Sequence, residues 1–171
     1  MAEPVVFVSH KRGDSWTRVA ERFYIKLKAM APSLGYEIFL DNEDLQGGDP
    51  WRPKLEAALS RTTHFVAFLC DEYWLSSECR RELDYAVHRF RTGNSPRLLF
   101  VLAEMMRPEH LLFDTHEHRG DVVTRVGDIN FLGPFDAARR LTALRWDDSY
   151  ILAQQMAQLA DRLIATLRPP S

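Results

Sequence analysis

The sequence is poor in the features that mark secreted, membrane-spanning or nucleic-acid-binding chains. It has only two cysteines, Cys70 and Cys79, which excludes a framework of several disulfides and favours a reducing cytosol. No apolar run approaches the roughly 20 residues of a membrane span, and the first residues lack the basic and then apolar segments of a signal peptide. Lys and Arg number 22 against 24 Asp and Glu, so the net charge of -2 predicts no strong attraction to nucleic acid or to a membrane.

What the chain does contain is a regular alternation of short apolar runs and longer helical patterns. Its 171 residues, 46% hydrophobic and 27% charged, suit one globular domain. We expect that domain to span residues 1–168, with 169–171 as a tail or the start of a linker to a sensor domain. A last helix is predicted over 149–167, and 105–140 is expected to be irregular with short helices. The predicted strands are residues 5–9, 36–40, 64–70, 97–103 and 141–146.

Strands that are almost continuously apolar are typical of a parallel sheet that is covered on both faces. The predicted fold class is therefore α/β, a flavodoxin-like doubly wound five-stranded parallel sheet in the order 2-1-3-4-5, with helices on both faces. Ligands of such sheets bind outside the carboxyl ends of the strands, at the switch point between the first and third strands. The loops "SHKRGD" and "CDEYWLSS" follow those two strands, and "DNEDLQGGDPW" reaches over the same edge from the second strand.

One carboxylate in the helix after the third strand is unusually placed. The apolar residues of "SSECRRELDYAVHRF" recur at helical spacing, but Glu82 lies beside their stripe rather than on the opposite face. Glu78 precedes it by one turn, and like charges at this spacing are unfavourable. Glu82 lies about one turn into the helix that leaves the third strand, so it is expected to face the crevice at the switch point. The cations expected near it are those of the first loop, His10, Lys11 and Arg12.

Each of these features also has a purely structural explanation. A lone helical glutamate is usually solvated, and "HKRGD" can serve simply as a polar turn and helix cap. "LQGGDPW" is sufficient as a glycine turn before a helix, and it lacks the Gly-Lys-Ser/Thr ending of a phosphate-binding loop. Trp51 and Trp74 can pack against their neighbours. The "HEH" at 116–118 has only loose metal-ligand spacing, so no metal site is predicted.

Taken in order, the pieces resemble a TIR domain, the Toll/interleukin-1 receptor homology module. "VVFVSHKRGD" is similar to the family's first box, a strand that ends in Phe-Val/Ile-Ser before a charged loop. "FLDNEDLQGGDPWRPKLEAAL" is similar to the second box with its BB loop, and "HFVAFLCDEYWLSSECRREL" to the third strand and the Ser-x-x-Cys-x-x-Glu-Leu helix start. Any one of these motifs is weak, but three in register at family spacing are strong. The resemblance is dense over residues 4–90 and looser from there to the C-terminus.

The resemblance implies a reaction as well as a fold. Bacterial and plant members that cleave NAD+ carry a glutamate at the position that matches Glu82, which is thereby the implied catalytic residue. NAD+ is the substrate, and no cofactor is implied. Nicotinamide leaves the ribose as a neutral base through an oxocarbenium-like state, so a carboxylate that stabilises the developing cation is the main requirement. The implied substrate-binding residues are His10, Lys11, Arg12, Glu43, Leu45, Gly48, Trp51, Trp74 and Cys79.

The sequence departs from the NAD-cleaving pattern at one position. Many such members have Trp four residues before the glutamate, and here that residue is Glu78. A surface on which nicotinamide or adenine stacks is therefore missing at that position. Trp74 or Tyr73, from the same loop, is the expected substitute.

The resemblance also implies partners. Family members work when they cluster through contacts at the BB loop, so self-association and a fused or separate sensor domain are expected, in immune or antiphage defence or in virulence. The product, linear or cyclic ADP-ribose, is left open. A non-catalytic TIR adaptor is the first alternative, and a nucleoside deoxyribosyltransferase-like enzyme is the second. A receiver domain is a poor third, because its first loop needs an acidic pair and this one is basic.

Overall fold

The computed structural model describes residues 2–40, 51–93, 95–105 and 130–167 of the chain. Its strands are β1 (Val5–Ser9), β2 (Glu37–Leu40), β3 (His64–Leu69), β4 (Arg97–Leu102) and β5 (Asn130–Gly133). Its helices are α1 (Asp14–Leu34), α3 (Trp51–Arg61), α4 (Asp71–Leu75), α5 (Ser77–Gly93) and α6 (Ser149–Leu167). The strands form one parallel sheet in the order β2-β1-β3-β4-β5, which confirms the predicted fold class.

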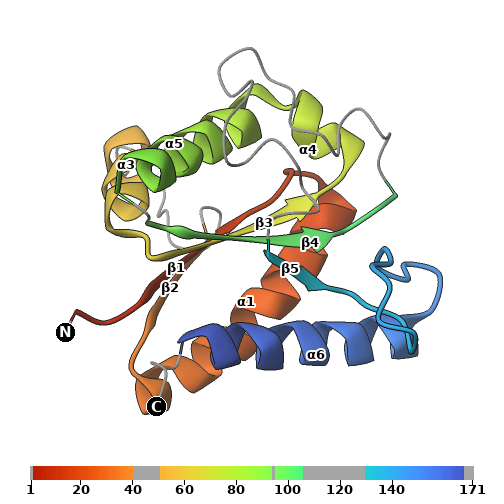
Figure 1. The fold of residues 1–171 in the computed structure, drawn as a ribbon. Coiled ribbons are helices and arrows are strands. Elements are labelled where there is room, and N and C mark those ends of the chain that lie inside the picture. The colour runs from red at the N-terminus through yellow and green to blue at the C-terminus, as the bar shows by residue number, and fades with distance from the viewer. Residues whose placement is uncertain (1, 41–50, 94, 106–129, 168–171) are drawn as a thin grey trace.

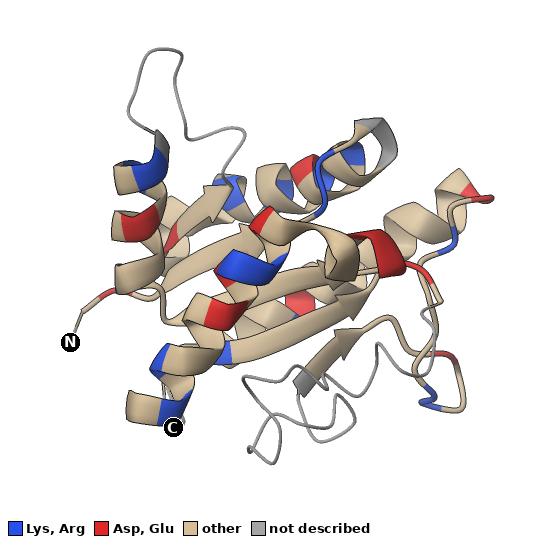
Figure 2. Ribbon diagram, turned by 90° about the horizontal axis from the view of Figure 1, so that it is seen from above, with Lys and Arg blue, Asp and Glu red and all other residues tan. Residues whose placement is uncertain are grey.

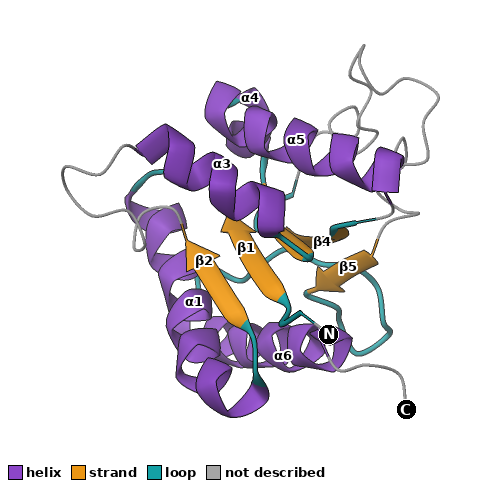
Figure 3. Ribbon diagram, turned by 90° about the vertical axis from the view of Figure 1, so that its left-hand side faces the viewer, coloured by secondary structure: helices purple, strands orange, loops and turns teal. Residues whose placement is uncertain are grey.

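The sheet lies between two layers of helices. Helices α1 and α6 cover one face, and α3, α4 and α5 cover the other, with β2 at one edge (Figures 1 and 3). Alternate residues of each strand point to opposite faces, so Val6 and Val8 join the core beneath α1 and α6, whereas Phe7 joins the core beneath α3, α4 and α5. All five residues of β1 are buried, as expected for a strand with neighbours on both sides and helices on both faces.

The fifth strand is not where the sequence pattern placed it. The predicted strand at 141–146 is wrong, because β5 is instead Asn130–Gly133, inside a region expected to hold only short helices and irregular chain. From 141–146 the chain makes one isolated bridge, between Leu141 and Phe135. Leu144 is buried in the core beside α6. The apolar residues of this segment therefore fill the core without joining the sheet.

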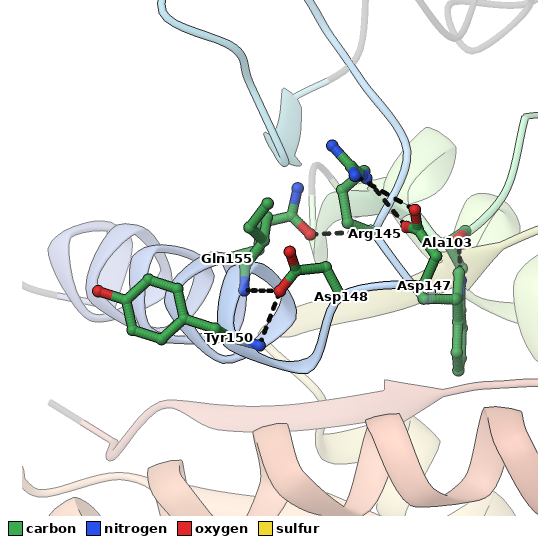
Figure 4. Close-up of polar contacts among 8 residues, drawn as sticks. Ala103, Arg145, Asp147, Asp148, Tyr150 and Gln155 are labelled. Atoms are coloured by element: carbon green, nitrogen blue, oxygen red, sulfur yellow. Dashed lines mark hydrogen bonds and ion pairs between the residues drawn. The ribbon is translucent and has the colours of Figure 1, made fainter.

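The connection into α6 is fixed by side chains (Figure 4). Oδ1 of Asp148 accepts hydrogen bonds from the backbone N–H groups of Tyr150 and Ile151, both at 3.0 Å, and so caps the helix. The indole Nε1 of Trp146 donates to the carbonyl oxygen of Ala103 at 2.7 Å, which attaches the segment to the end of β4. Helix α6 thus begins at Ser149, as predicted. None of the helices in the described part of the chain is long and apolar enough to cross a membrane.

Replacing Asp148 by Ala should lower the free energy of unfolding by about 1 kcal/mol, because two N–H groups of the first turn lose their acceptor. The midpoint of thermal unfolding checks this. Asp147→Ala is the matched control, since this neighbouring carboxylate makes only an exposed ion pair with Arg145 and such pairs contribute little. Equal losses of stability from the two variants would contradict the capping role of Asp148.

Candidate functional site

Glu82 is a buried carboxylate at the carboxyl end of the central strands. Helix α5 begins beside Ser76, whose Oγ accepts from the backbone N–H of Cys79 at 3.4 Å. Glu82 follows about one turn later and is only 6% exposed, so it is not the solvated glutamate of the plain structural explanation. Its Oε2 accepts a hydrogen bond from the hydroxyl of Ser9, the last residue of β1, at 2.5 Å. A buried carboxylate needs such a donor, because leaving water is costly for a charge without one.

A second hydroxyl group lies behind Ser9. The phenol oxygen of Tyr73, in the short helix α4, is 2.8 Å from the Oγ of Ser9. Tyr73 is fully buried, and burial raises the pKa of its phenol well above the ordinary value, so the group stays protonated. Neither hydroxyl group was predicted from the sequence to contact Glu82. The available signal was Ser9 itself, a polar residue that closes an otherwise apolar strand.

A pocket of about 140 Å³ opens beside Glu82, between α3 and α5. The loop after β1 contributes Arg12 to its wall, α3 contributes Arg52, and α5 contributes Arg81 and Tyr85. Seen from the side of these helices, acidic and basic residues are interspersed (Figure 2). The polar and aromatic residues that line the pocket are Arg12, Arg52, Glu56, Glu78, Arg81, Glu82 and Tyr85.

The comparison with known families covers most of this architecture. A family model described as a TIR domain matches residues 6–141. The chain belongs to the TIR domain family. A search of the curated proteins finds no match. The matched region contains Ser9, Tyr73 and Glu82, and it ends before α6.

The three residues that were predicted in the first loop lie in different positions relative to the pocket. Arg12 lines the pocket, and its guanidinium lies 3.8 Å from the carboxylate of Glu78. His10 is buried, and its Nδ1 lies 3.0 Å from the carbonyl oxygen of Lys11. Neither His10 nor Lys11 is among the pocket-lining residues. Arg12 is therefore the one residue of this predicted group of three that borders the pocket containing Glu82.

Apart from Trp74, the remaining predicted substrate-binding residues fall into three groups. Cys79 is buried, and its thiol donates to the carbonyl oxygen of His10 at 3.5 Å, which joins α5 to the first loop. Trp51 begins α3, and its side chain lies outside the described part of the structure. The predicted BB-loop residues also lie outside the described residues; they are Glu43, Leu45 and Gly48.

Neither of the two expected substitutes for the missing Trp lines the pocket. Tyr73 is fully buried, and its hydroxyl contacts Ser9. Trp74 is 8% exposed, and the guanidinium carbon of Arg80 lies 4.9 Å from the centre of its ring. The aromatic residue that does line the pocket is Tyr85, which is 37% exposed. Its spacing of three residues from Glu82 puts both side chains on one face of α5, a signal that the sequence contained.

The thiols of this TIR domain do not offer a nucleophile. Cys70 and Cys79 form no disulfide, and both are buried. Burial raises the pKa of the Cys70 thiol to about 11, so almost none of it is thiolate at neutral pH. Its sulfur accepts the backbone N–H of Tyr73 at 3.2 Å and so caps α4. Among the described residues, no group of three His, Cys, Asp or Glu side chains is arranged to hold a metal ion.

We expect both thiols to resist labelling by Ellman's reagent at pH 8 in the folded protein. For Cys70, a pKa of about 11 alone slows the reaction on the order of 100-fold relative to a free thiol, and burial slows it further. Both thiols should react rapidly once guanidinium chloride unfolds the chain. Fast labelling of either cysteine before unfolding would show that the site holds an accessible thiol.

Proposed function

We propose that this TIR domain is an NAD+ glycohydrolase in which Glu82 is the catalytic carboxylate. The observation that carries the proposal is the environment of Glu82, which is buried, accepts a hydrogen bond from Ser9 and lines a pocket that three arginines border. The family match supports it, because NAD-cleaving TIR domains have their glutamate at this position of the motif.

The proposed reaction breaks the bond between C1′ of the ribose and the nitrogen of nicotinamide. The electron pair of that bond neutralises the cationic ring, so nicotinamide leaves as a neutral base and no general acid is needed. The positive charge that develops on the ribose is stabilised by the carboxylate of Glu82, which lies on the wall of the pocket. The oxygen of a water molecule then bonds to C1′ and releases a proton, which leaves ADP-ribose.

The size and charge of the pocket suit one end of a dinucleotide. Its volume of about 140 Å³ is well below the ~300–1,000 Å³ of pockets that enclose a whole drug-sized ligand. We infer that it receives the nicotinamide and its ribose, and that the rest of the dinucleotide extends past Arg12 and Arg52. Guanidinium groups are suited to the pyrophosphate, since they donate two parallel hydrogen bonds to it. Clustering then supplies the remaining walls from neighbouring copies.

On this proposal the chain is an effector domain. A fused or separate sensor drives self-association, and the clustered domains deplete cytoplasmic NAD+ or release an ADP-ribose-type signal in immune or antiphage defence. A non-catalytic TIR adaptor is the second candidate function. Glu78 favours the adaptor, because this pocket residue stands where many NAD-cleaving members have Trp.

Nicotinamide release from NAD+, followed by chromatography, tests the enzyme. Purified protein should be assayed both dilute and clustered on a multivalent scaffold. The clustered wild type should turn over NAD+, and Glu82→Ala should lower the rate at least about 100-fold, because the charge that stabilises the transition state is gone. Glu37→Ala, which removes an exposed glutamate from the edge strand β2, is the matched control. If a folded and clustered wild type releases no nicotinamide, the glycohydrolase proposal is wrong and the non-catalytic adaptor becomes the preferred function.

Tyr85→Ala should raise KM for NAD+ by about 10-fold, because stacking of a base on an aromatic ring contributes about 1–3 kcal/mol. Tyr85→Phe keeps the ring and should stay near the wild-type value. Tyr150→Ala, which removes an exposed tyrosine from α6, is the control for the loss of a surface ring. An unchanged KM in Tyr85→Ala would place the bases of the dinucleotide elsewhere.

A further inference from the structure

We propose that Ser9 and Tyr73 are positioning residues for Glu82. They form a directed chain of hydrogen bonds that holds one carboxylate oxygen in place before substrate arrives. This inference rests on the proposed function, since it assigns the two residues a part in the reaction of Glu82. No motif in the sequence assigns that part to either residue.

The direction of the chain follows from counting protons. A serine hydroxyl has a single hydrogen, and the hydrogen of Ser9 goes to Oε2 of Glu82 because a carboxylate oxygen only accepts. The contact of 2.8 Å between Ser9 and Tyr73 therefore uses the phenol as donor and the serine oxygen as acceptor. Both bonds point toward the carboxylate, and hydrogen bonds in such a row polarise and strengthen one another.

Burial keeps the chain intact. Tyr73 is fully buried, Ser9 is 1% exposed and Glu82 is 6% exposed, so water competes little for these groups. Burial also raises the pKa of the Tyr73 phenol, with a further contribution from the charge of Glu82. The phenol therefore stays protonated, and remains a hydrogen-bond donor, at neutral pH. The low-dielectric surroundings make each of these bonds stronger than a similar bond at the surface.

Each member of the chain is fixed by its own element. Ser9 pairs with Ala67 of β3 and cannot shift without disturbing the sheet. The backbone N–H of Tyr73 donates to the sulfur of Cys70 at 3.2 Å, and its carbonyl oxygen accepts from the N–H of Ser76 at 3.2 Å. The three functional groups thus come from β1, α4 and α5, and their separation is set by the packing of those elements on one another.

A carboxylate held in this way is suited to stabilise a developing cation. Because Ser9 donates to Oε2, that oxygen is kept as an acceptor with a fixed orientation. A preorganised charge needs no reorientation at the moment of reaction. Electrostatic stabilisation of this kind is usually the largest single contribution to the lowering of the activation barrier. We infer that clustering completes the pocket around a carboxylate that is already in position, rather than moving the carboxylate itself.

Steady-state kinetics of clustered Tyr73→Phe, Ser9→Ala and Ser9→Thr test the positioning role. Tyr73→Phe keeps the buried ring and removes one hydroxyl, and it should lower kcat about 10-fold with KM changed less than about twofold. Ser9→Ala removes the donor to Glu82 and should lower kcat by about 10- to 100-fold, again at nearly constant KM. Ser9→Thr keeps the hydroxyl and should restore most of the lost kcat.

Tyr36→Phe is the matched control for the tyrosine. The Tyr36 hydroxyl is also buried and donates to a backbone carbonyl, that of Leu27, and neither residue lines the pocket beside Glu82. Tyr36→Phe and Tyr73→Phe should lower the thermal midpoint by similar amounts, but only the second should lower kcat. Wild-type kcat in folded Tyr73→Phe and Ser9→Ala would overturn the positioning role while leaving the glycohydrolase intact. An inactive clustered wild type would instead overturn the proposed function and this inference with it.

Discussion

The hydrogen bond from Ser9 to Glu82 joins a central strand of the sheet to the helix that carries the candidate site. A carboxylate that is 6% exposed destabilises a fold unless donors replace the water it has lost. The donor stands at the end of β1, where the parallel arrangement brings it beside the start of α5. The path of the chain from β3 through α4 into α5 is therefore constrained by the need to bring Glu82 to this hydroxyl. Tyr73 satisfies the serine in turn, which extends the constraint to α4.

The hydrogen bonds among Tyr73, Ser9 and Glu82 bear both on the stability of the fold and on the candidate site. The same bonds that make the burial of Glu82 tolerable also fix the orientation of its carboxylate in the wall of the pocket. The surrounding walls contribute differently: the ion pair between Arg12 and Glu78 is half exposed and worth little to folding. Loss of this ion pair would therefore change the free energy of unfolding little. The carboxylate of Glu82 is thus buried and hydrogen-bonded, whereas Arg12 and Glu78 at the edge of the pocket are half exposed.

The sequence predicted the parts of the structure that depend on local pattern. β1 to β4 follow from continuous apolar runs, and the order of the strands from the alternation of strands with helices. β5 could not be found in this way, because four residues that end in glycine become a strand only through pairing with β4. The position of Glu82 was predicted from its motif and from the switch point. Its contacts with Ser9 and, through it, with Tyr73 join groups 73 and 64 residues apart, and no periodicity records such contacts.

The end of α6 has a practical consequence for how copies of this domain are brought together. The helix packs on the face of the sheet opposite α3, α4 and α5, and its last described residue, Leu167, lies on that side (Figure 1). A tether joined to the end of α6 would begin on the face of the sheet opposite α3, α4 and α5. In domains joined to a scaffold at this end, the attachment and the pocket would lie on opposite faces of the sheet.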